Sequence, residues 1–397
     1  MLLLGAFILW ALLSVLWSDY RLATLLAVVV LLVTTFAAIT IVRARGWAGT
    51  VRTLSWALLT VVGLSLLFEL MVEAIGRPVL PVFPINVEPG EKVPDAFYWS
   101  RALLFEGGRI QGILGNANLL GFVALLLLIV AGCQWAAGTV PRGYGAVAVA
   151  LAVATLALTR SSTVIAATIA VVVLLVVVLL GRRSRWAGWA VAAGVVIVGS
   201  VGAVLFSPQL LGLLGKSDDL TGRLDIWASV TDLFLERSVI GWGWTSYWQP
   251  WVPLFQELAE RNGVVYLQAH NAFLDVAFQL GVIGLALFVG FIVATCMAIG
   301  RRGIPLQGEG LRDAGWVVGK LLPSLLLAAL LTQAVAESRL LVEGNWALLC
   351  IIAFAASGVG RGTTSNAPAL PEHGTAGPEL RQPRPSSSPG RSARRPR

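Results

Sequence analysis

The sequence predicts an all-α, polytopic integral membrane protein of about ten transmembrane helices with a long, partly helical extracytoplasmic loop. Of the 397 residues, 57% are hydrophobic and 13% are charged, whereas a soluble domain is about 45–50% apolar and about 25% charged. The mean hydropathy is +0.81, and apolar runs of about 20 residues, the length that crosses a bilayer, recur along the chain. This composition excludes a soluble enzyme, a disordered hub and a nucleic-acid-binding domain.

Ten apolar segments are expected to cross the membrane. Residues 144–181 could form a single helix, but at 1.5 Å per residue it would be about 57 Å long, too long for one crossing. We therefore divide it at 159–162, which places Arg160 near the tip of a hairpin. The expected spans are residues 1–17, 22–42, 51–72, 112–133, 144–159, 163–181, 186–206, 272–299, 316–336 and 345–360.

Basic residues in short loops orient these spans, because such loops stay in the cytoplasm. Both termini are then cytoplasmic, and long loops at about 73–111 and 207–271 face outward. Residues 1–360 form the transmembrane domain, and 361–397, a basic stretch rich in Pro, Ser and Arg, is expected to be a disordered cytoplasmic tail. The orienting residues are Arg43, Arg45, Arg52, Arg142, Arg182, Arg183, Arg185, Arg301 and Arg302.

The loop 207–271 is too long for an ordinary connection and is expected to be ordered. Residues 222–237 have the apolar periodicity of a helix, and Gly241-Trp242-Gly243-Trp244 then ends it. A second amphipathic pattern with Trp248, Trp251 and Phe255 follows. Because Trp and Tyr favour the membrane–water boundary, we expect this loop to lie on the bilayer surface, where a lipid-borne substrate presents its head group.

Several polar side chains are expected on the same outer face. Arg223, Arg109, Arg160 and Arg339 carry guanidinium groups, whose fork of donors suits phosphate oxygens. His270 is the only histidine outside the tail, and an imidazole accepts a proton near neutral pH. This set suits one chemistry: holding a diphosphate leaving group while deprotonating an acceptor hydroxyl. No acidic cluster resembles a metal site, so arginine would neutralise the charge and no metal or cofactor is expected.

Each of these residues also has a structural interpretation, and the two kinds stay open at this stage. Cys133, Cys296 and Cys350 lie in separate apolar runs and support neither a zinc site nor a disulfide. The structural alternatives are a helix cap for His270, pairing of Arg223 with Asp225 or Asp219, snorkelling of Arg160, a local Glu337–Arg339 ion pair, helix caps for Asn116 and Asn118, and an interfacial anchor for the Trp-rich stretch.

The order of these motifs resembles the O-antigen ligase and polymerase family of multispanning membrane glycosyltransferases. The resemblance spans most of residues 8–355 and is most specific in the second half of the long loop. It departs from the family at Ala117, where Pro is usual, and at Thr159, where Ser is usual. The matching segments are Gly222-Arg223-Leu224-Asp225-Ile226-Trp227, Gly241-Trp242-Gly243, Ala269-His270-Asn271-Ala272-Phe273-Leu274, Leu280-Gly281-Val282-Ile283-Gly284, Arg109-Ile110-Gln111-Gly112, Asn116-Ala117-Asn118-Leu119, Thr159-Arg160-Ser161-Ser162 and residues 10–24.

The resemblance implies transfer of a glycan from undecaprenyl diphosphate to an acceptor at the outer face of a bacterial cytoplasmic membrane, without a metal or nucleotide sugar. Carried over by position, His270 would activate the acceptor and Arg223 would hold the diphosphate. Arg160 and Arg109 would complete the anion site, and Asn271 and Trp227 are assigned with them to substrate binding. The partners expected are the lipid-linked donor, a glycan, lipid or protein acceptor, and membrane lipids.

Two classes of function remain. The first is an enzyme: a ligase, a polysaccharide polymerase or a protein O-oligosaccharyltransferase, which differ only in the acceptor. The second is a transporter or lipid-binding protein without chemistry, which predicts ionisable residues deep in the spans. The polar groups gather at one face instead, and this favours the enzyme.

Overall fold

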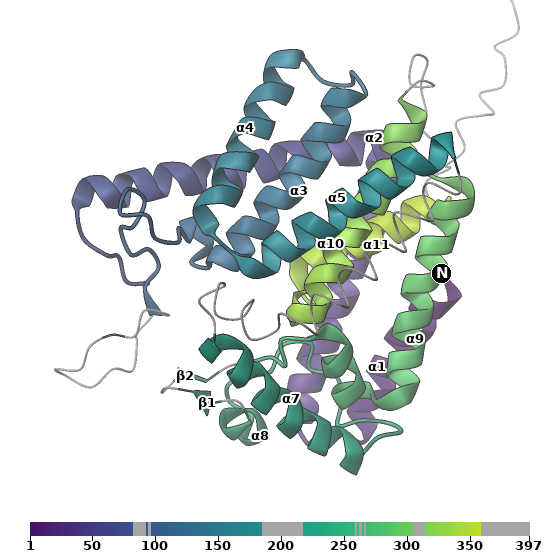
Figure 1. Cartoon of the computed structure of the whole chain (residues 1–397). Coiled ribbons are helices and arrows are strands. Elements are labelled where there is room, and N and C mark those ends of the chain that lie inside the picture. Colours follow the sequence, from purple (N-terminus) through teal and green to yellow (C-terminus); the bar gives the residue numbers. More distant parts are fainter. Residues whose placement is uncertain are drawn as a thin grey trace, which may run out of the picture. The chain divides into compact units, whose positions relative to one another are not determined.

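The computed structural model describes residues 1–81, 93, 97–184, 217–258, 260–261, 264–265, 267–304 and 314–358 (Figure 1). The expected span 186–206 and the tail 361–397 lie outside these residues. The elements in chain order are α1 (Leu2–Leu13), η1 (Ser14–Leu16), α2 (Arg21–Ile75), η3 (Gly112–Leu114), α3 (Ala117–Ala136), α4 (Arg142–Thr159), α5 (Ser162–Arg183), α7 (Ser217–Glu236), α8 (Pro253–Glu257), β1 (Glu260–Arg261), β2 (Val264–Val265), α9 (Ala272–Arg302), η4 (Val317–Leu321), α10 (Leu322–Ala336), η5 (Ser338–Leu341) and α11 (Glu343–Ser357).

The predicted all-α membrane class is confirmed. Among the described residues, six helical segments are long and apolar enough to cross a membrane: α2, α3, α4, α5, α9 and the continuous η4–α10 segment. Leu2–Leu16 and Glu343–Ser357 are shorter apolar helices. The division of 144–181 into two helices is also confirmed, because α4 ends at Thr159 and α5 begins at Ser162. The total of ten spans stays a prediction.

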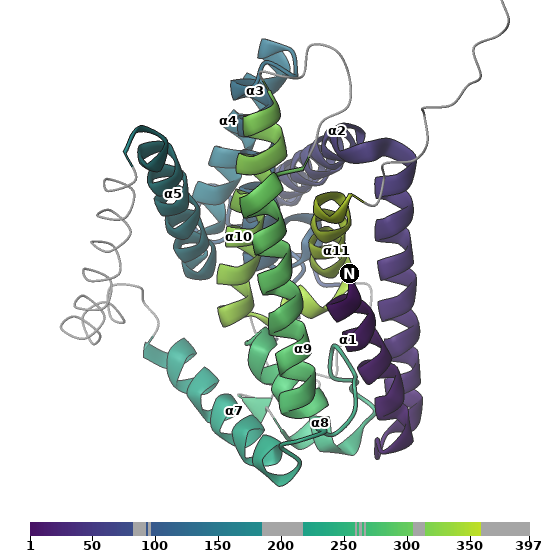
Figure 2. The same cartoon turned by 90° about the vertical axis from the view of Figure 1, so that its right-hand side faces the viewer.

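One expected loop is a sharp kink. Residues 43–50 were expected to separate two spans, and within α2 two helices meet there across a kink at Gly46. Gly46, with φ 60° and ψ −179°, is the one non-helical position, and α2 bends sharply along its length (Figure 2). After the bend, the indole nitrogen of Trp47 donates to the carbonyl of Val318 at 2.7 Å. The two expected spans therefore correspond to the two helical halves of α2 on either side of this kink.

The halves of α2 pack against different helices. The first half contacts α11, where the Trp346 indole donates to Thr35 Oγ1 at 2.9 Å. The second half contacts α4, where Ser55 and Tyr144 share a hydrogen bond of 2.8 Å. A large apolar core joins α1, α2, α3, α9, α10 and α11, and the large apolar side chains outside it, such as Phe36 at 71% exposure, fit a surface that faces lipid.

The described residues between α5 and α9, which were expected to be ordered, form a small apolar core together with residues of α2 and α9. Trp248 and Phe255 are buried and stack at 5.6 Å between ring centroids, whereas Trp251 is exposed. They pack with Val230 of α7 and Phe278 of α9. In Figure 1, α7, α8, β1 and β2 gather beside the first turns of α9. This subdomain holds the residues that immediately precede α9.

Three glycines dock the subdomain onto α9. Gly281 has φ 66° and ψ −171° and interrupts α9, and a Cβ built there would overlap the carbonyl oxygen of Val239. A Cβ on Gly241, which has φ 72°, would likewise overlap the backbone of Gln279. The amide of Gly243 donates to the Gln279 carbonyl at 2.8 Å. The Gly-x-Gly and Leu-Gly motifs thus meet each other, and this contact satisfies backbone groups that the interrupted helix leaves open.

This contact predicts that Gly281→Ala lowers the free energy of unfolding by at least about 1–2 kcal/mol, the cost of a left-handed conformation, because the overlap with Val239 adds to it. Thermal unfolding of the purified protein in detergent measures the effect. Gly300→Ala in the same helix is the control, since a Cβ there meets open space and alanine favours a helix. Equal stability of the two variants would contradict the close approach.

Candidate active site

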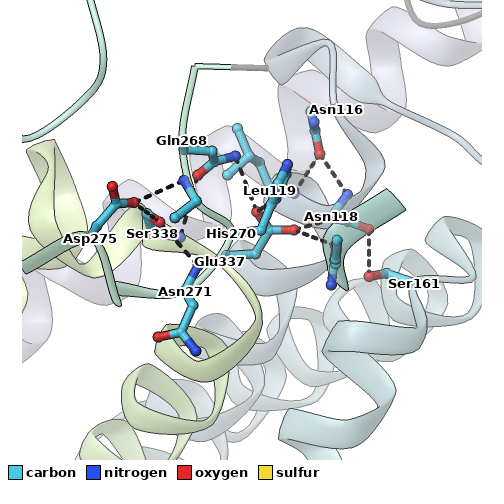
Figure 3. A network of polar contacts seen from close by, with 12 residues as sticks. Asn116, Asn118, Leu119, Ser161, Gln268, His270, Asn271, Asp275, Glu337 and Ser338 are labelled. Carbon is cyan, nitrogen blue, oxygen red and sulfur yellow. Dashed lines mark hydrogen bonds and ion pairs between the residues drawn. The ribbon is translucent and has the colours of Figure 1, made fainter. Parts of the chain in front are cut away.

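Glu337 lies at the centre of a buried polar cluster (Figure 3). It follows the last residue of α10, and its side chain is 7% exposed. Its Oε1 accepts from Arg223 Nη2 at 3.2 Å and from Asn118 Nδ2 at 3.3 Å. Its Oε2 lies 3.0 Å from His270 Nδ1 and accepts from Gln268 Nε2 at 3.3 Å. One carboxylate therefore joins α3, α7, α10 and the segment that precedes α9.

The surroundings of Glu337 keep it ionised. Burial alone would raise its pKa, but the hydrogen bond and charge of His270, together with the charges of Arg223 and Arg339, outweigh burial and hold the pKa of Glu337 below its ordinary value. An ionised carboxylate only accepts hydrogen bonds. His270 must therefore donate from Nδ1 to Glu337, so a neutral His270 carries its lone pair on Nε2.

The backbone of His270 is held in a strained conformation. Its φ is 53°, a left-handed value that few residues other than glycine adopt. The side chain is 12% exposed. Such strain persists only where the surrounding structure imposes it, and it is common in active sites.

Hydrogen bonds on both sides of His270 impose this conformation. Ahead of it, the Ala269 amide donates to Asp275 Oδ2 at 3.0 Å, and the Ala269 carbonyl accepts from the Trp227 indole at 2.8 Å. After it, the Asn271 amide donates to Ser338 Oγ at 3.2 Å. The Asn271 side chain caps α9, and Ser338 Oγ also donates to Asp275. Trp227 and Asn271, assigned from the sequence to substrate binding, lie where they position His270.

Arg109 reaches the same cluster through Asn118. Its Nη2 donates to Asn118 Oδ1 at 2.7 Å, and its Nε donates to the Thr159 carbonyl at 3.2 Å. Ser161 Oγ also donates to Asn118 Oδ1, at 2.8 Å. Since Asn118 Nδ2 donates to Glu337, the loop before α3 and the α4–α5 turn are linked to the carboxylate.

A second buried carboxylate positions the loop that carries Arg109. Glu69 of α2 is 1% exposed, and its Oε1 accepts from the amides of Gln111 at 2.8 Å and Gly112 at 2.6 Å. Its Oε2 accepts from Ser100 Oγ at 2.7 Å. These bonds tie both sides of the Arg109 loop to one turn of α2.

Arg160 lies beside this network. It ends α4 with φ 46°, and it is exposed next to Ser161. A Cβ on Gly107 would lie 3.6 Å from its Nη2, so the guanidinium lies against the turn that precedes Arg109. Within the described part of the chain, Arg160 has no hydrogen bond or ion pair. Its guanidinium group therefore makes fewer polar contacts with the protein than those of Arg223 and Arg109.

The structure assembles most of the predicted site and adds residues to it. His270 and Arg223 both contact Glu337, so Arg223 pairs with a residue far away in the chain, and among the described residues no salt bridge joins Glu337 to Arg339. Arg339 instead lies 5.6 Å from the centre of the Tyr247 ring. A lone carboxylate at the end of an apolar span was the signal in the sequence for Glu337.

The two asparagines at the start of α3 have different roles. Asn116 caps the helix by accepting from the amides of Asn118 and Leu119, as the capping interpretation predicted. Asn118 instead uses its side chain to bridge Arg109, Ser161 and Glu337. Sequence reasoning did not separate them, because both residues are typical helix caps.

No three His, Cys, Asp or Glu side chains come together as a metal site would require, as far as the described residues extend. The polar groups around Glu337 are suited instead to anions and to proton transfer: guanidinium groups, amide donors and one imidazole.

Comparison with known proteins finds a match for part of the chain. Residues 147–289 match the family model described as O-antigen ligase. This segment contains most of α4, all of α5 and α7 and the first half of α9, and with them Arg160, Arg223 and His270. No curated protein matches the chain.

The ion pairs of Glu337 predict a pH-dependent contribution to stability. The pKa of Glu337 is lowered on folding from about 4.5, so this contribution is present above that pH and is lost as pH falls through the lower folded-state value. Glu337→Gln should destabilise the protein by about 3 kcal/mol near neutral pH, as expected when a buried pair is broken. The deficit should shrink at acidic pH.

Thermal unfolding in detergent across this pH range measures the deficit. Asp232→Asn, at an exposed position of α7, is the control and should change stability by less than about 0.5 kcal/mol. A Glu337→Gln deficit that does not vary with pH would mean that Glu337 is not ionised in the folded protein.

Proposed function

We propose that the chain, in which residues 147–289 match the O-antigen ligase family model, is a metal-independent glycosyltransferase that uses a lipid-linked oligosaccharide. The family match supports glycan transfer in cell-surface polysaccharide synthesis. The proposed donor is a glycan on undecaprenyl diphosphate. The observation that supports the proposal is the convergence of His270 and Arg223 on Glu337: an imidazole and a guanidinium contact the same carboxylate at 3.0 and 3.2 Å.

His270 is the proposed general base. Its Nδ1 bond to Glu337 orients the ring and stabilises the imidazolium that forms when Nε2 accepts a proton. The acceptor hydroxyl loses its proton to Nε2 as its oxygen attacks the anomeric carbon of the donor sugar. The bond between that carbon and the diphosphate oxygen breaks, so direct attack inverts the anomeric configuration. Glu337 acts on His270 and is a positioning residue.

The arginines are proposed to receive the negative charge that develops on the leaving diphosphate. Arg223 uses one Nη on Glu337 and has further donors for phosphate oxygens. Arg160 is exposed beside the Arg109 loop, so these three guanidinium groups together form an anion site. Preorganised cations of this kind stabilise a developing negative charge without a metal ion.

The proposed site faces outward from a bacterial cytoplasmic membrane, with both chain termini in the cytoplasm. The acceptor is a glycan, a lipid or a protein. Ligase, polymerase and protein O-oligosaccharyltransferase share the chemistry above, because only the nucleophile differs between them.

We expect His270→Ala to lower the rate of transfer by about 10²–10⁴-fold, the usual contribution of a general base. The assay uses protein in liposomes with a glycan on undecaprenyl diphosphate, a crude envelope extract as acceptor, and release of free undecaprenyl diphosphate as the measured product. His373→Ala, which replaces the other histidine, is the matched control and should keep wild-type activity. A ladder of glycan sizes would identify a polymerase, and one conjugate of fixed length would identify a ligase.

Arg223→Lys tests the anion site separately. Lysine keeps the charge but loses the fork of donors, so we expect transfer to fall by at least about tenfold, the effect of losing one charge-assisted hydrogen bond. Arg223→Ala should abolish transfer, whereas insertion into the membrane should be normal in both variants. Full activity of both His270→Ala and Arg223→Ala would remove this mechanism, and no release from any donor by folded wild-type protein would favour a transporter.

A further inference from the structure

A cavity lined by both apolar and polar side chains lies far from the Glu337 cluster, at the other end of α3. Its volume is about 400 Å³. It lies between the second half of α2, the end of α3 and the start of α4. The lining residues are Arg52, Ser55, Trp56, Gln134, Thr139, Val140, Pro141 and Tyr144.

The position of this cavity fits the opposite boundary of the membrane. Asn118, in the Glu337 cluster, and Gln134 lie near the two ends of α3. Sixteen residues of helix separate them, a rise of about 24 Å, close to the hydrocarbon thickness of about 30 Å. Trp56 and Trp135 are exposed near this end, and aromatic side chains favour the boundary between hydrocarbon and water. The cavity therefore lies at the level of lipid head groups.

An unsatisfied polar group lines the cavity. Gln134 is 4% exposed, and its Oε1 has no hydrogen-bond partner among the described residues. A buried acceptor without a donor destabilises the folded protein. Ser55, Tyr144 and Thr139 are also polar, but each already has a partner. The Ser55 and Tyr144 hydroxyls form a hydrogen bond with each other, and the Thr139 hydroxyl donates to the main-chain carbonyl of Gln134. A ligand with a hydrogen-bond donor would satisfy Gln134 Oε1.

Positive charge is concentrated at the same place. The N-terminus of α4 has no side-chain cap after Pro141, and its first turn lines the cavity through Tyr144. Open amides at a helix N-terminus, together with the helix dipole, attract phosphate groups. Arg52 adds a guanidinium, and none of the lining residues is acidic. The ligand should therefore carry a phosphate as well as a donor.

We propose that this cavity binds the head group of an anionic phospholipid that bears free hydroxyls, of the phosphatidylglycerol type. The phosphate contacts Arg52 and the first amides of α4, and a glycerol hydroxyl donates to Gln134 Oε1. The acyl chains leave past Trp56 along the apolar surface of α2. This site is independent of the chemistry proposed for the Glu337 cluster.

The test uses the full chain, purified in detergent and stripped of lipid, with short-chain phosphatidylglycerol as the probe. Native mass spectrometry counts bound lipid, and thermal unfolding reports the stabilisation. We expect one preferred phosphatidylglycerol per chain, and Arg52→Gln should weaken it about fivefold or more, since one arginine near anionic lipid contributes about 1 kcal/mol. Arg43→Gln, exposed on the same helix and outside the cavity, should bind as wild type does.

Gln134→Leu provides a second test, in which a loss of lipid binding cannot be explained by a folding defect. It removes the unsatisfied amide, so the lipid-free protein should be as stable as wild type or more stable, whereas phosphatidylglycerol binding should weaken. Phosphatidylcholine, phosphatidylethanolamine and inorganic phosphate distinguish the sources of the phosphate. Equal binding of any of these, or unchanged phosphatidylglycerol binding in both Arg52→Gln and Gln134→Leu, would overturn the proposal.

Discussion

A single ionised carboxylate, buried at the end of α10, sets the arrangement of the polar residues around it. Removing a charge from water costs several kcal/mol, so such a group persists only where opposite charges and donors surround it. Glu337 draws these partners from α3, α7 and the segment before α9. The same requirement explains why residues separated by 219 positions in the chain, Asn118 and Glu337, lie in contact.

Other contacts in the fold hold these partners in position around Glu337. The glycine contact between Gly241 and Gly281 docks the subdomain onto an interrupted helix, and Asp275 holds the backbone just before His270. On the other side, Glu69 holds the loop that carries Arg109. At each of these places the backbone leaves the helical conformation, at an end or a break of a helix. Other protein groups then supply the hydrogen bonds that its amides and carbonyls need in an apolar surrounding.

The sequence predicted the membrane class, the α4–α5 hairpin, the helix at 222–237 and the candidate pair of His270 and Arg223, because apolar runs, helical periodicity and rare polar residues are local signals. It did not predict that Glu337 joins this pair, since the partners of a carboxylate depend on which helix ends meet in space. The break between the spans on either side of residues 43–50 was predicted, but its form as a kink at Gly46 was not, because hydropathy does not distinguish a kink from a loop.

The shared carboxylate makes His270 and Arg223 thermodynamically linked. Both draw on the same negative charge, so their interactions with Glu337 are not additive: the effect of replacing one residue depends on whether the other is present. Glu337 is therefore the group through which a change at Arg223 alters the surroundings of His270, and the reverse.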